Sequence, residues 1–313
     1  MREILLKKQK TKKGYNHSFF PGNSWCYFKI YCSHLVGERV ICEVIKPLIT
    51  KLQSKEENLC WFFIRYEDTD HHIRLRIASS KIAKITYKLN KLLTPLIQEG
   101  YIFSMQIDTY KREIERYQEN NIELSETLFC YDSQAVIDVV EIINHIGDED
   151  IRWRTAILSV DYLLNDFEVS LEEKMQLMED LYKGFMPEFV DMSDHEALKR
   201  FKSSIDTKLR QYNSLLDEII RLKNYDSLQN FVPIFNKRSY KNQTIVPQIK
   251  ENIVTTQKLI TLVKDYIHMN LNRIFPTNAR MHELVIYFLM FKAYYSNYNR
   301  NKALLNKGFT SLE

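Results

Sequence analysis

The stretch Trp61-Phe62-Phe63-Ile64-Arg65-Tyr66 is followed, after a short polar break, by His72-Ile73-Arg74-Leu75-Arg76-Ile77. The second run alternates strictly, which predicts a strand with His72, Arg74 and Arg76 on one face and apolar side chains on the other. Like charges two residues apart on one strand face repel each other, so an anion is the natural missing partner. The alternative is a solvated strand edge that happens to carry basic residues.

The composition describes a mildly basic protein of 313 residues with a formal net charge of +4. The charge bias is too weak to indicate a polyanionic partner, so any such partner must be argued from local clusters. Five scattered cysteines, never spaced as Cys-x-x-Cys, argue against a disulfide framework and a thiolate zinc site, and they fit a reducing cytoplasm. No run approaches the roughly 20 apolar residues that span a bilayer, so we expect a cytoplasmic protein without a membrane span.

The N-terminal third alternates between strand and helix patterns after a lysine-rich arm, residues 1–20, that we expect to be flexible. The patterns come in the order strand, helix, strand, strand, helix, strand, over residues 25–32, 36–55, 61–66, 72–77, 81–98 and 101–110. This order predicts a ferredoxin-like βαββαβ part over residues 21–120, with helices on one face of the sheet and an open opposite face. Pro47 allows its helix only with a kink or a late start.

If the apolar sides of the four strands meet the helices, the open face is aromatic, basic and hydrogen-bonding. It then gathers Tyr27, Lys29, Tyr31, Arg65, His72, Arg74, Arg76, Gln106, Asp108 and Tyr110. A register error of one residue would exchange the two faces of a strand. Just beyond, Arg112 and Arg116 lie four residues apart and share a face in either a helix or a strand. The glutamates beside them leave an ordinary salt-bridged surface as an equal alternative.

From residue 121 to residue 313 the pattern is almost entirely helical, and the fold class is therefore α+β. We expect this half to cover the open face of the sheet and to act with it as one functional unit. The helical segments fall near 125–146, 150–165, 171–183, 194–223, 246–272 and 278–305. Residues 226–246 are polar and poorly periodic, so we predict a long loop whose Lys237, Arg238 and Lys241 contact a partner.

His268 is a candidate for proton transfer. On a helix it lies near Asp265 at i−3 and Asn272 at i+4, so its neighbours can orient the imidazole. The alternative is a histidine near a helix end that is satisfied locally. The sequence has no glycine-rich phosphate loop, no His-Glu-x-x-His, no Gly-x-Ser-x-Gly and no dinucleotide fingerprint, which excludes the familiar hydrolase, kinase and Rossmann patterns. We expect neither a cofactor nor a metal.

Several spaced motifs occur in a consistent order along the chain. They are Pro21-Gly22-x-x-Trp25-x-Tyr27-x-Lys29-x-Tyr31, the two strand motifs quoted first, Thr109-Tyr110-x-Arg112-Glu113-Ile114-Glu115-Arg116-Tyr117, Asp132-Ser133-x-Ala135-Val136 and His268-Met269-x-x-Asn272-Arg273. From about Phe20 to its C-terminus the chain thereby resembles the C-terminal, glutamate-eliminating domain of lantibiotic dehydratases. It departs from the usual pattern at Thr69, Gln118 and Pro276, where proline, glycine and glycine are common; these changes affect turns rather than charged residues.

The resemblance implies a lyase of bacteriocin biosynthesis. In the family, a separate domain or protein esterifies Ser or Thr of a ribosomally made precursor by using glutamyl-tRNA, and the elimination domain removes glutamate to leave dehydroalanine or dehydrobutyrine. The implied partners are the glutamylated precursor and a separate glutamylating protein, without direct nucleic-acid contact. The implied catalytic residues are Arg74, Arg76, Arg112 or Arg116, and His268. The implied substrate contacts are Tyr27, Lys29, Arg65, His72, Tyr110, Asn272 and Arg273.

Two alternatives remain beside elimination. Stand-alone members of similar length also act as thiopeptide macrocyclases, which join two dehydroalanines in a formal [4+2] cycloaddition and expel a leader peptide. Those relatives generally lack the full arginine and histidine set that this chain keeps. A peptide- or RNA-binding scaffold is the second alternative, because aromatic and basic side chains on an open sheet can stack bases. The RNA-recognition signature is absent from this sequence.

Overall fold

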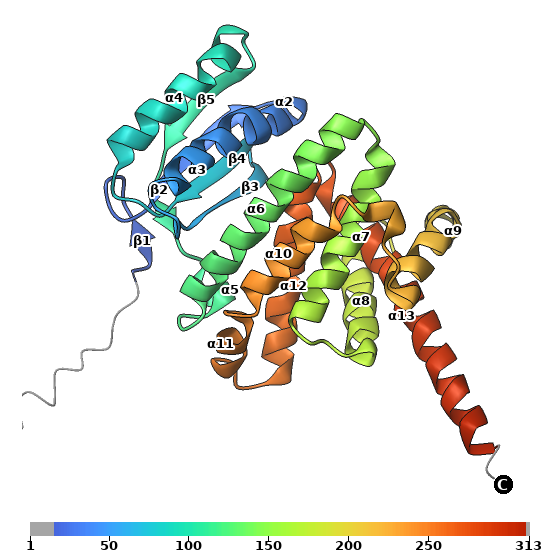
Figure 1. The fold of residues 1–313 in the computed structure, drawn as a ribbon. Coiled ribbons are helices and arrows are strands. Elements are labelled where there is room, and N and C mark those ends of the chain that lie inside the picture. Colours follow the sequence, from blue (N-terminus) through green and yellow to red (C-terminus); the bar gives the residue numbers. More distant parts are fainter. Residues whose placement is uncertain (1–15, 311–313) are drawn as a thin grey trace, which may run out of the picture.

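The computed structural model describes residues 16–310, and side chains up to residue 303. A small sheet with helices on one face lies against a larger helical half (Figure 1). The chain is therefore of mixed α+β class. Residues 1–15 of the predicted flexible arm lie outside the described part. Its end is ordered, because β1 (Ser18–Phe19) pairs antiparallel with β6 (Tyr110–Lys111).

The main sheet has four antiparallel strands in the order β3-β4-β2-β5. The elements of this part are β2 (Cys26–Cys32), α2 (His34–Arg39), the π-helical turn η1 (Val40–Ile45), α3 (Lys46–Gln53), β3 (Trp61–Glu67), β4 (His71–Ile77), α4 (Ile82–Gln98) and β5 (Ile102–Ile107). They follow the predicted chain order. The helix begins at His34 and continues without a break through the π-helical turn η1 into α3, with Pro47 directly after that turn, so the predicted late start is not found.

The strand register defines the two faces of the sheet. Phe28 pairs with Leu75 and Ile30 with Ile73, and these fully buried side chains face the helices. Arg65 pairs with Ile73 and therefore lies on this helix-covered face, so its predicted place on the open face was wrong. The error has a physical reason: β3 is buried on both faces and is apolar on both, so it shows no alternation from which its faces could be assigned.

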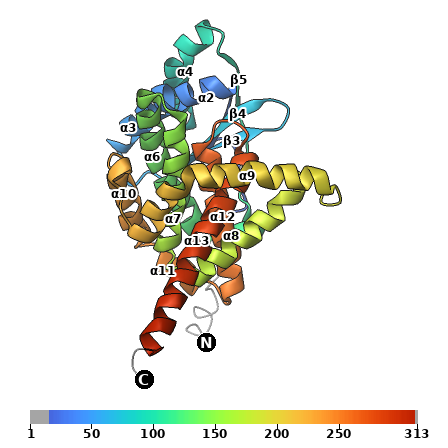
Figure 2. The same ribbon diagram turned by 90° about the vertical axis from the view of Figure 1, so that its right-hand side faces the viewer.

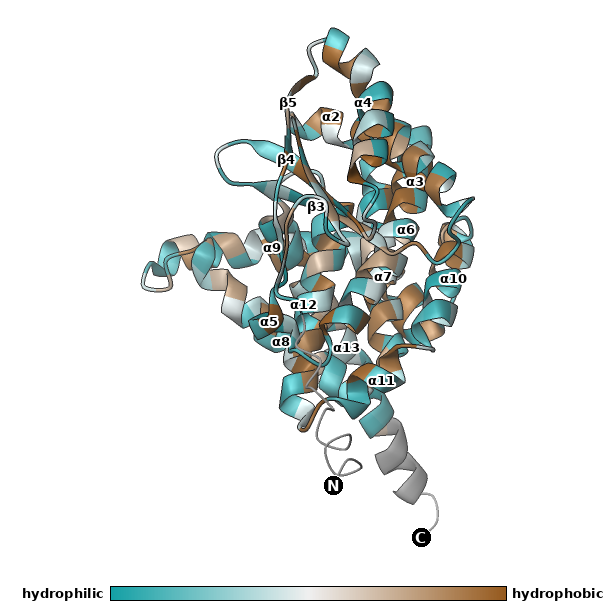
Figure 3. Cartoon of the chain, turned by 90° about the vertical axis from the view of Figure 1, so that its left-hand side faces the viewer, coloured by the Kyte–Doolittle hydropathy of each residue, from teal (hydrophilic) through white to brown (hydrophobic). Residues whose placement is uncertain are grey.

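The opposite face carries three cross-strand rows, which we call the cationic face. The rows are Phe62, Arg76 and Tyr27; Ile64, Arg74, Lys29 and Gln106; and Tyr66, His72, Tyr31 and Ser104. The predicted faces of β2 and β4 are therefore correct. Figure 3 shows the strands of this sheet edge-on, with α3 and α4 on one side of them.

The helical half follows from residue 114. Its elements are α5 (Ile114–Tyr117), α6 (Ile122–Ile146), α7 (Glu149–Asp166), α8 (Leu171–Phe185), η2 (Met186–Glu188), α9 (His195–Leu216), η3 (Asp217–Leu222), η4 (Asp226–Leu228), α10 (Val232–Asn242), α11 (Val246–Glu251), α12 (Thr256–Ile274) and α13 (Ala279–Thr310). In Figure 2, α12 and α13 run through the centre of this half, while α8 and α9 extend to one side. Within the described residues, no helix combines the length and the apolar character needed to cross a membrane.

The outer edge of β3 is capped by side chains instead of by another strand. Asn272 accepts a hydrogen bond from the Arg65 N–H (3.0 Å) and donates one to the Arg65 carbonyl (2.9 Å). Arg273 Nε donates to the Phe63 carbonyl (2.8 Å), and the Phe63 N–H donates to Ser133 Oγ (3.3 Å). An edge strand needs such partners when it is buried. The structure thus uses Asn272 and Arg273 to dock α12 on the sheet; their predicted role in substrate binding stays a prediction.

Residues 226–246 are not a loop, so that prediction was wrong. Most of the segment forms η4 and α10, with Pro233 in the first helical turn. Arg238 is buried and donates to Asp132 (2.8 Å) and to Ser159. A helix that buries a guanidinium does not show the apolar periodicity that the sequence reading required. Arg238 is engaged inside the protein and is not available to a partner, whereas Lys237 is exposed and partner contact through Lys237 and Lys241 stays a prediction.

Asp132 is the shared partner of buried side chains from α10 and α12. Its buried carboxylate accepts hydrogen bonds from Arg238, Asn270 and Arg273 at 2.7–2.8 Å. Asp132→Ala leaves two buried guanidinium groups without their anion, and we expect the free energy of unfolding to fall by about 3 to 5 kcal/mol. Urea unfolding measures this. Glu123→Ala on the exposed side of α6 is the control and should cost at most about 1 kcal/mol; similar losses in both variants would contradict the prediction.

Candidate active site

Arg76 is the most unusual residue of the cationic face. Its guanidinium lies among three aromatic rings, 4.6 Å from the Tyr27 centroid, 5.2 Å from Phe62 and 5.0 Å from Tyr110. The residue is only 7% exposed, and its side chain has neither an ion pair nor a hydrogen bond with any described residue; its Nε is shielded and unpartnered. Burying a charge without a counter-ion is costly, so an anionic ligand is the natural partner of this group.

A small cavity of about 20 Å³ adjoins Arg76 between the sheet and the helical half. It is also lined by Tyr117 of α5, Phe129 of α6 and Met269 of α12. The later helices therefore cover the Arg76 end of the cationic face, and they bring Met269, the neighbour of His268, to the same cavity. The other end stays open, because Tyr66 is 41% exposed.

Arg74 lies at the open end and is held by neighbours on its own face. Its Nε donates to His72 Nε2 (3.0 Å), and its guanidinium lies 3.2 Å from the Tyr66 ring centroid. His72 Nδ1 lies 2.9 Å from the Asp70 carbonyl, so Nδ1 carries the proton and Nε2 accepts. Burial lowers the pKa of His72, which favours this neutral form. His72 is fully buried and positions Arg74, and its predicted contact with substrate stays a prediction.

Lys29 was predicted to bind substrate, but the structure gives its charge an internal partner. Its Nζ lies 2.7 Å from Asp108, and the hydrogen bond between them raises the pKa of Lys29. Tyr27 and Tyr110 are buried against Arg76. They therefore shape the surroundings of the guanidinium instead of presenting free hydroxyls at an open surface.

Arg112 is engaged inside the protein. Its guanidinium binds the buried carboxylate of Glu126 through two hydrogen bonds of 2.7 and 2.6 Å, and the Tyr110 hydroxyl donates to the same carboxylate (2.8 Å). A bidentate pair of this kind neutralises the arginine. Arg112 therefore supports Tyr110 through Glu126, and of the predicted pair Arg112 or Arg116 the structure favours Arg116 for the catalytic role.

Arg116, one turn later, is in a different position. Its side chain is 39% exposed, and its Nε donates to Asp265 of α12 (2.8 Å). Asp265 lies one turn before His268 on the same helix, so the structure brings Arg116 and His268 to one surface. Gln118, where glycine is usual in the resembled family, adopts a φ of +64°, a conformation that favours glycine. The chain turns there directly after Arg116 and Tyr117.

His268 is oriented by a residue that the sequence analysis did not identify. Its Nδ1 lies 3.0 and 2.9 Å from the two carboxylate oxygens of Glu283, which is fully buried on α13 and also accepts from the Tyr287 hydroxyl (3.2 Å). A carboxylate at Nδ1 fixes the proton there and leaves Nε2 as the base. One feature of the sequence could have identified this partner. Glu283 is a lone carboxylate directly before the apolar run Leu284–Met290, a position that favours burial, and buried carboxylates are seldom unpaired.

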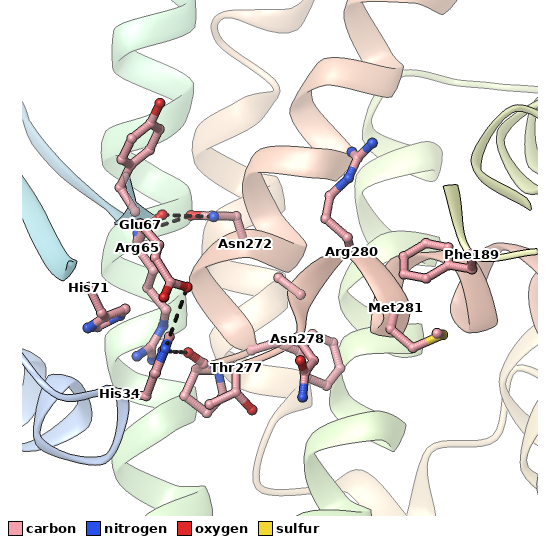
Figure 4. A pocket seen from close by; sticks show the side chains of 14 residues that line it. His34, Arg65, Glu67, His71, Phe189, Asn272, Thr277, Asn278, Arg280 and Met281 are labelled. Atoms are coloured by element: carbon pink, nitrogen blue, oxygen red, sulfur yellow. Dashed lines mark hydrogen bonds and ion pairs between the residues drawn. The ribbon is translucent and has the colours of Figure 1, made fainter. Parts of the chain in front are cut away.

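A larger cavity of about 360 Å³ adjoins the site (Figure 4). It lies between the end of β3, the start of α2 and the connection from α12 to α13. Tyr66, whose ring lies against the Arg74 guanidinium, lines this cavity. Arg280 also lines it, and its Nη1 lies 3.8 Å from Glu283, the partner of His268. In the described part of the chain, no group of three or more His, Cys, Asp or Glu side chains is arranged to hold a metal ion.

Glu283→Gln tests the orientation of His268 with little change in size. The amide offers an NH₂ group as donor and one carbonyl oxygen as acceptor, so Nδ1–H is no longer enforced, and we expect kcat to fall by about 10- to 100-fold with KM nearly unchanged. Nitrogen NMR shifts of the imidazole should show a loss of the Nδ1–H tautomer. Tyr287→Phe, which removes only the second contact of Glu283, should keep that tautomer. An unchanged tautomer in Glu283→Gln would show that Glu283 does not set it.

The chain matches known proteins along most of its length. The family model for the C-terminal part of lantibiotic biosynthesis dehydratases matches residues 25–295. The nisin biosynthesis protein NisB of Lactococcus lactis subsp. lactis is 24% identical over 278 residues, which cover 86% of this chain and 25% of NisB. The subtilin biosynthesis protein SpaB of Bacillus subtilis is 25% identical over 288 residues, which cover 90% of this chain and 26% of SpaB. The chain thus spans about a quarter of the length of these relatives.

Two solved structures share the fold. The tRNA dependent lantibiotic dehydratase MibB from Microbispora sp. 107891 superposes with a TM-score of 0.63 at 18% identity, over 90% of this chain and 29% of MibB. The pyridine synthase TbtD from thiomuracin biosynthesis gives 0.61 at 11% identity, over 88% of this chain and 99% of TbtD. Identities this low show the fold alone. The family model, which matches well over half of the sequence, shows that this chain belongs to the family of lantibiotic biosynthesis dehydratase C-terminal domains.

Proposed function

We propose that this protein is a lyase that eliminates glutamate from glutamylated Ser or Thr of a ribosomally made precursor peptide, leaving dehydroalanine or dehydrobutyrine. The observation that carries the proposal is the buried, unpartnered guanidinium of Arg76, beside a cavity that also contacts the helix of His268. The reaction supplies an anion at each stage, first as an enolate-like carbonyl oxygen and then as the departing carboxylate. A guanidinium in a site that excludes water would stabilise both of these anions.

The proposed chemistry needs one base and several cations. His268 Nε2 removes the Cα proton of the modified residue, the Cα=Cβ bond forms, and the Cβ–O bond breaks as glutamate leaves with its carboxylate. Glu283 holds the proton on His268 Nδ1, so the imidazolium that forms keeps a counter-ion. Arg76, Arg74 and Arg116 are the cations that face this reaction, and no electron donor or acceptor is required.

Macrocyclisation is the second candidate, because the pyridine synthase TbtD has this fold over nearly the whole of its chain. The site argues against it. Two dehydroalanines are neutral, and joining them would leave the buried charge of Arg76 without an anion at any stage. The family model and the cationic site together support elimination as the better proposal.

The same proposal covers the peptide-binding cavity, the source of the glutamyl group, the cellular location and the organisation of the chain. The cavity of about 360 Å³ would take peptide residues that flank the modified one. A separate glutamylating protein would add the glutamyl group from glutamyl-tRNA, in keeping with the tRNA dependence of MibB. We also propose a cytoplasmic location, a ferredoxin-like N-terminal part supported by the order β3-β4-β2-β5, and joint action of residues 21–120 with residues 121–313.

One experiment tests the function. The purified protein is incubated with a precursor that already carries glutamyl esters, and the peptide is followed by mass spectrometry. Elimination is expected to remove one glutamate per ester and to leave alkenes that add thiols. Expulsion of a leader with ring formation would favour macrocyclisation, and an unchanged peptide that still binds would favour a scaffold.

A further inference from the structure

Two cysteines from distant parts of the sequence meet where the helical half packs on the sheet. Cys60 directly precedes β3, and Cys130 lies in α6, which packs along β3 (Figure 1). The Cys60 thiol donates to the Glu126 carbonyl (3.5 Å), one helical turn before Cys130. The Cys130 thiol donates to the Leu59 carbonyl (3.7 Å), directly before Cys60. Each thiol therefore lies against the backbone beside the other cysteine, and both are free thiols.

The two thiols of this pair differ in acidity. A hydrogen bond from Cys60 lowers the pKa of Cys130, and the nearby charge of Lys241 lowers it further, although burial acts in the opposite direction. The same hydrogen bond, together with burial, raises the pKa of Cys60. Burial raises the pKa of each of the other three cysteines to about 11, and these are Cys26, Cys32 and Cys42. Cys130 is therefore the cysteine of this chain that most readily forms a thiolate.

Packing alone does not account for the pair. A buried cysteine usually serves as a small apolar side chain, and a single thiol is enough for that role. Two thiols in contact, one of which readily loses its proton, are the arrangement that oxidation by a peroxide requires, because one sulfur is oxidised and the second resolves the product. Cys60 is partly exposed, so the pair lies close enough to the surface for a molecule as small as hydrogen peroxide to reach it.

We propose that Cys60 and Cys130 are a redox-sensitive modification site that closes to a disulfide when a hydroperoxide is present, and that this bond slows the enzyme. The Cys130 thiolate attacks one oxygen of hydrogen peroxide, the O–O bond breaks, and a sulfenic acid forms while the released hydroxide takes up a proton to become water. The Cys60 sulfur then attacks the Cys130 sulfur and loses its proton, and the S–O bond breaks to release a second water. The two thiols are oxidised and the peroxide is reduced. In a reducing compartment the dithiol is the resting form.

The disulfide acts on the surroundings of Arg76, and this step rests on the proposed function. Phe62 follows Cys60 by two residues, Phe129 directly precedes Cys130, and the centroids of these two rings are 5.4 Å apart. Both rings line the cavity beside Arg76, and the Phe62 centroid lies 5.2 Å from its guanidinium. A disulfide brings its sulfur atoms to about 2 Å, closer than two thiols in contact, and it removes both thiol hydrogen bonds to the backbone. The segments that carry the two rings must therefore move, and a displacement of about 1 Å at a reacting group can cost about 100-fold in rate.

The test follows bond formation and activity in the same samples. The reduced protein is exposed to hydrogen peroxide and digested, and mass spectrometry of the peptides should find residues 60 and 130 linked until dithiothreitol separates them. Oxidised wild type should eliminate glutamate from a glutamylated precursor about tenfold or more slowly than the reduced protein, and dithiothreitol should restore the rate.

Three variants locate the chemistry. Cys130→Ala removes the thiolate, so it should form no link and its rate should not respond to peroxide. Cys60→Ser keeps a hydroxyl that can donate to the Glu126 carbonyl, and without the resolving thiol the sulfenic acid of Cys130 should persist and be trapped by dimedone. Cys42→Ser is the control, because it removes another partly exposed cysteine and should leave both the link and the response to peroxide as in the wild type.

Other outcomes overturn the proposal. Oxidation confined to Cys42, or a sulfinic acid at Cys130 without a linked peptide, would show that Cys60 and Cys130 are not a dithiol site. A linked peptide with an unchanged rate would show that the bond does not reach the elimination site. Failure of the proposed function is read separately, because a reduced protein that eliminates no glutamate would refute that function while the peptide masses still decide whether the disulfide forms.

Discussion

Replacing His268 with alanine is expected to lower kcat for glutamate elimination by about 10²- to 10⁴-fold, the contribution of a well-placed general base. The Nδ1 of His268 is held by a fully buried carboxylate, so Nε2 is presented in one orientation and one tautomer. Quenched-flow mass spectrometry of the glutamylated precursor measures the loss. Added imidazole should restore part of the activity, because the substitution leaves a space where the ring was.

The control for this experiment is His145→Ala, which changes an exposed histidine at the end of α6. It should leave kcat and KM unchanged. Full activity in His268→Ala, with glutamate still released, would remove His268 from the mechanism and would leave the Glu283 pair as a structural contact between α12 and α13.

Replacing Arg76 with methionine should produce an unusual pair of effects. Loss of an electrostatic contact in the transition state should cost about 2 to 4 kcal/mol, a decrease in kcat/KM of about 30- to 1,000-fold. The free protein should become as stable as the wild type or more stable, because a buried charge without a counter-ion is removed and the methionine can pack among the same rings. Steady-state kinetics and urea unfolding measure the two effects.

Arg112→Met is the matched control for Arg76→Met, because it removes the same group from a site where the charge is paired. It leaves the buried carboxylate of Glu126 without a cation, so the free energy of unfolding should fall by about 3 to 5 kcal/mol. A loss of stability in Arg76→Met as large as that of Arg112→Met would mean that Arg76 also has a structural partner, and the anion-site interpretation would be wrong.

The sequence by itself determined the elements that are apolar on one face and polar on the other. β4 is apolar on one face and basic on the other, so its alternation predicted Arg74 and Arg76 together on the cationic face. The order of strands and helices up to residue 110 and most helices of the second half followed from spacing in the same way. The spaced motifs also carried the resemblance to the family that the chain belongs to.

The tertiary structure decided what depends on contacts between distant segments. β3 is buried on both faces, so only its pairing with β4 shows that Arg65 faces the helices. α10 hides a guanidinium whose partner, Asp132, comes from another helix. Arg112 and Arg116 are alike in sequence, and only packing gives the first a buried carboxylate and leaves the second beside His268. Spacing reports local geometry, whereas the partner of each charge is set by which helices pack together.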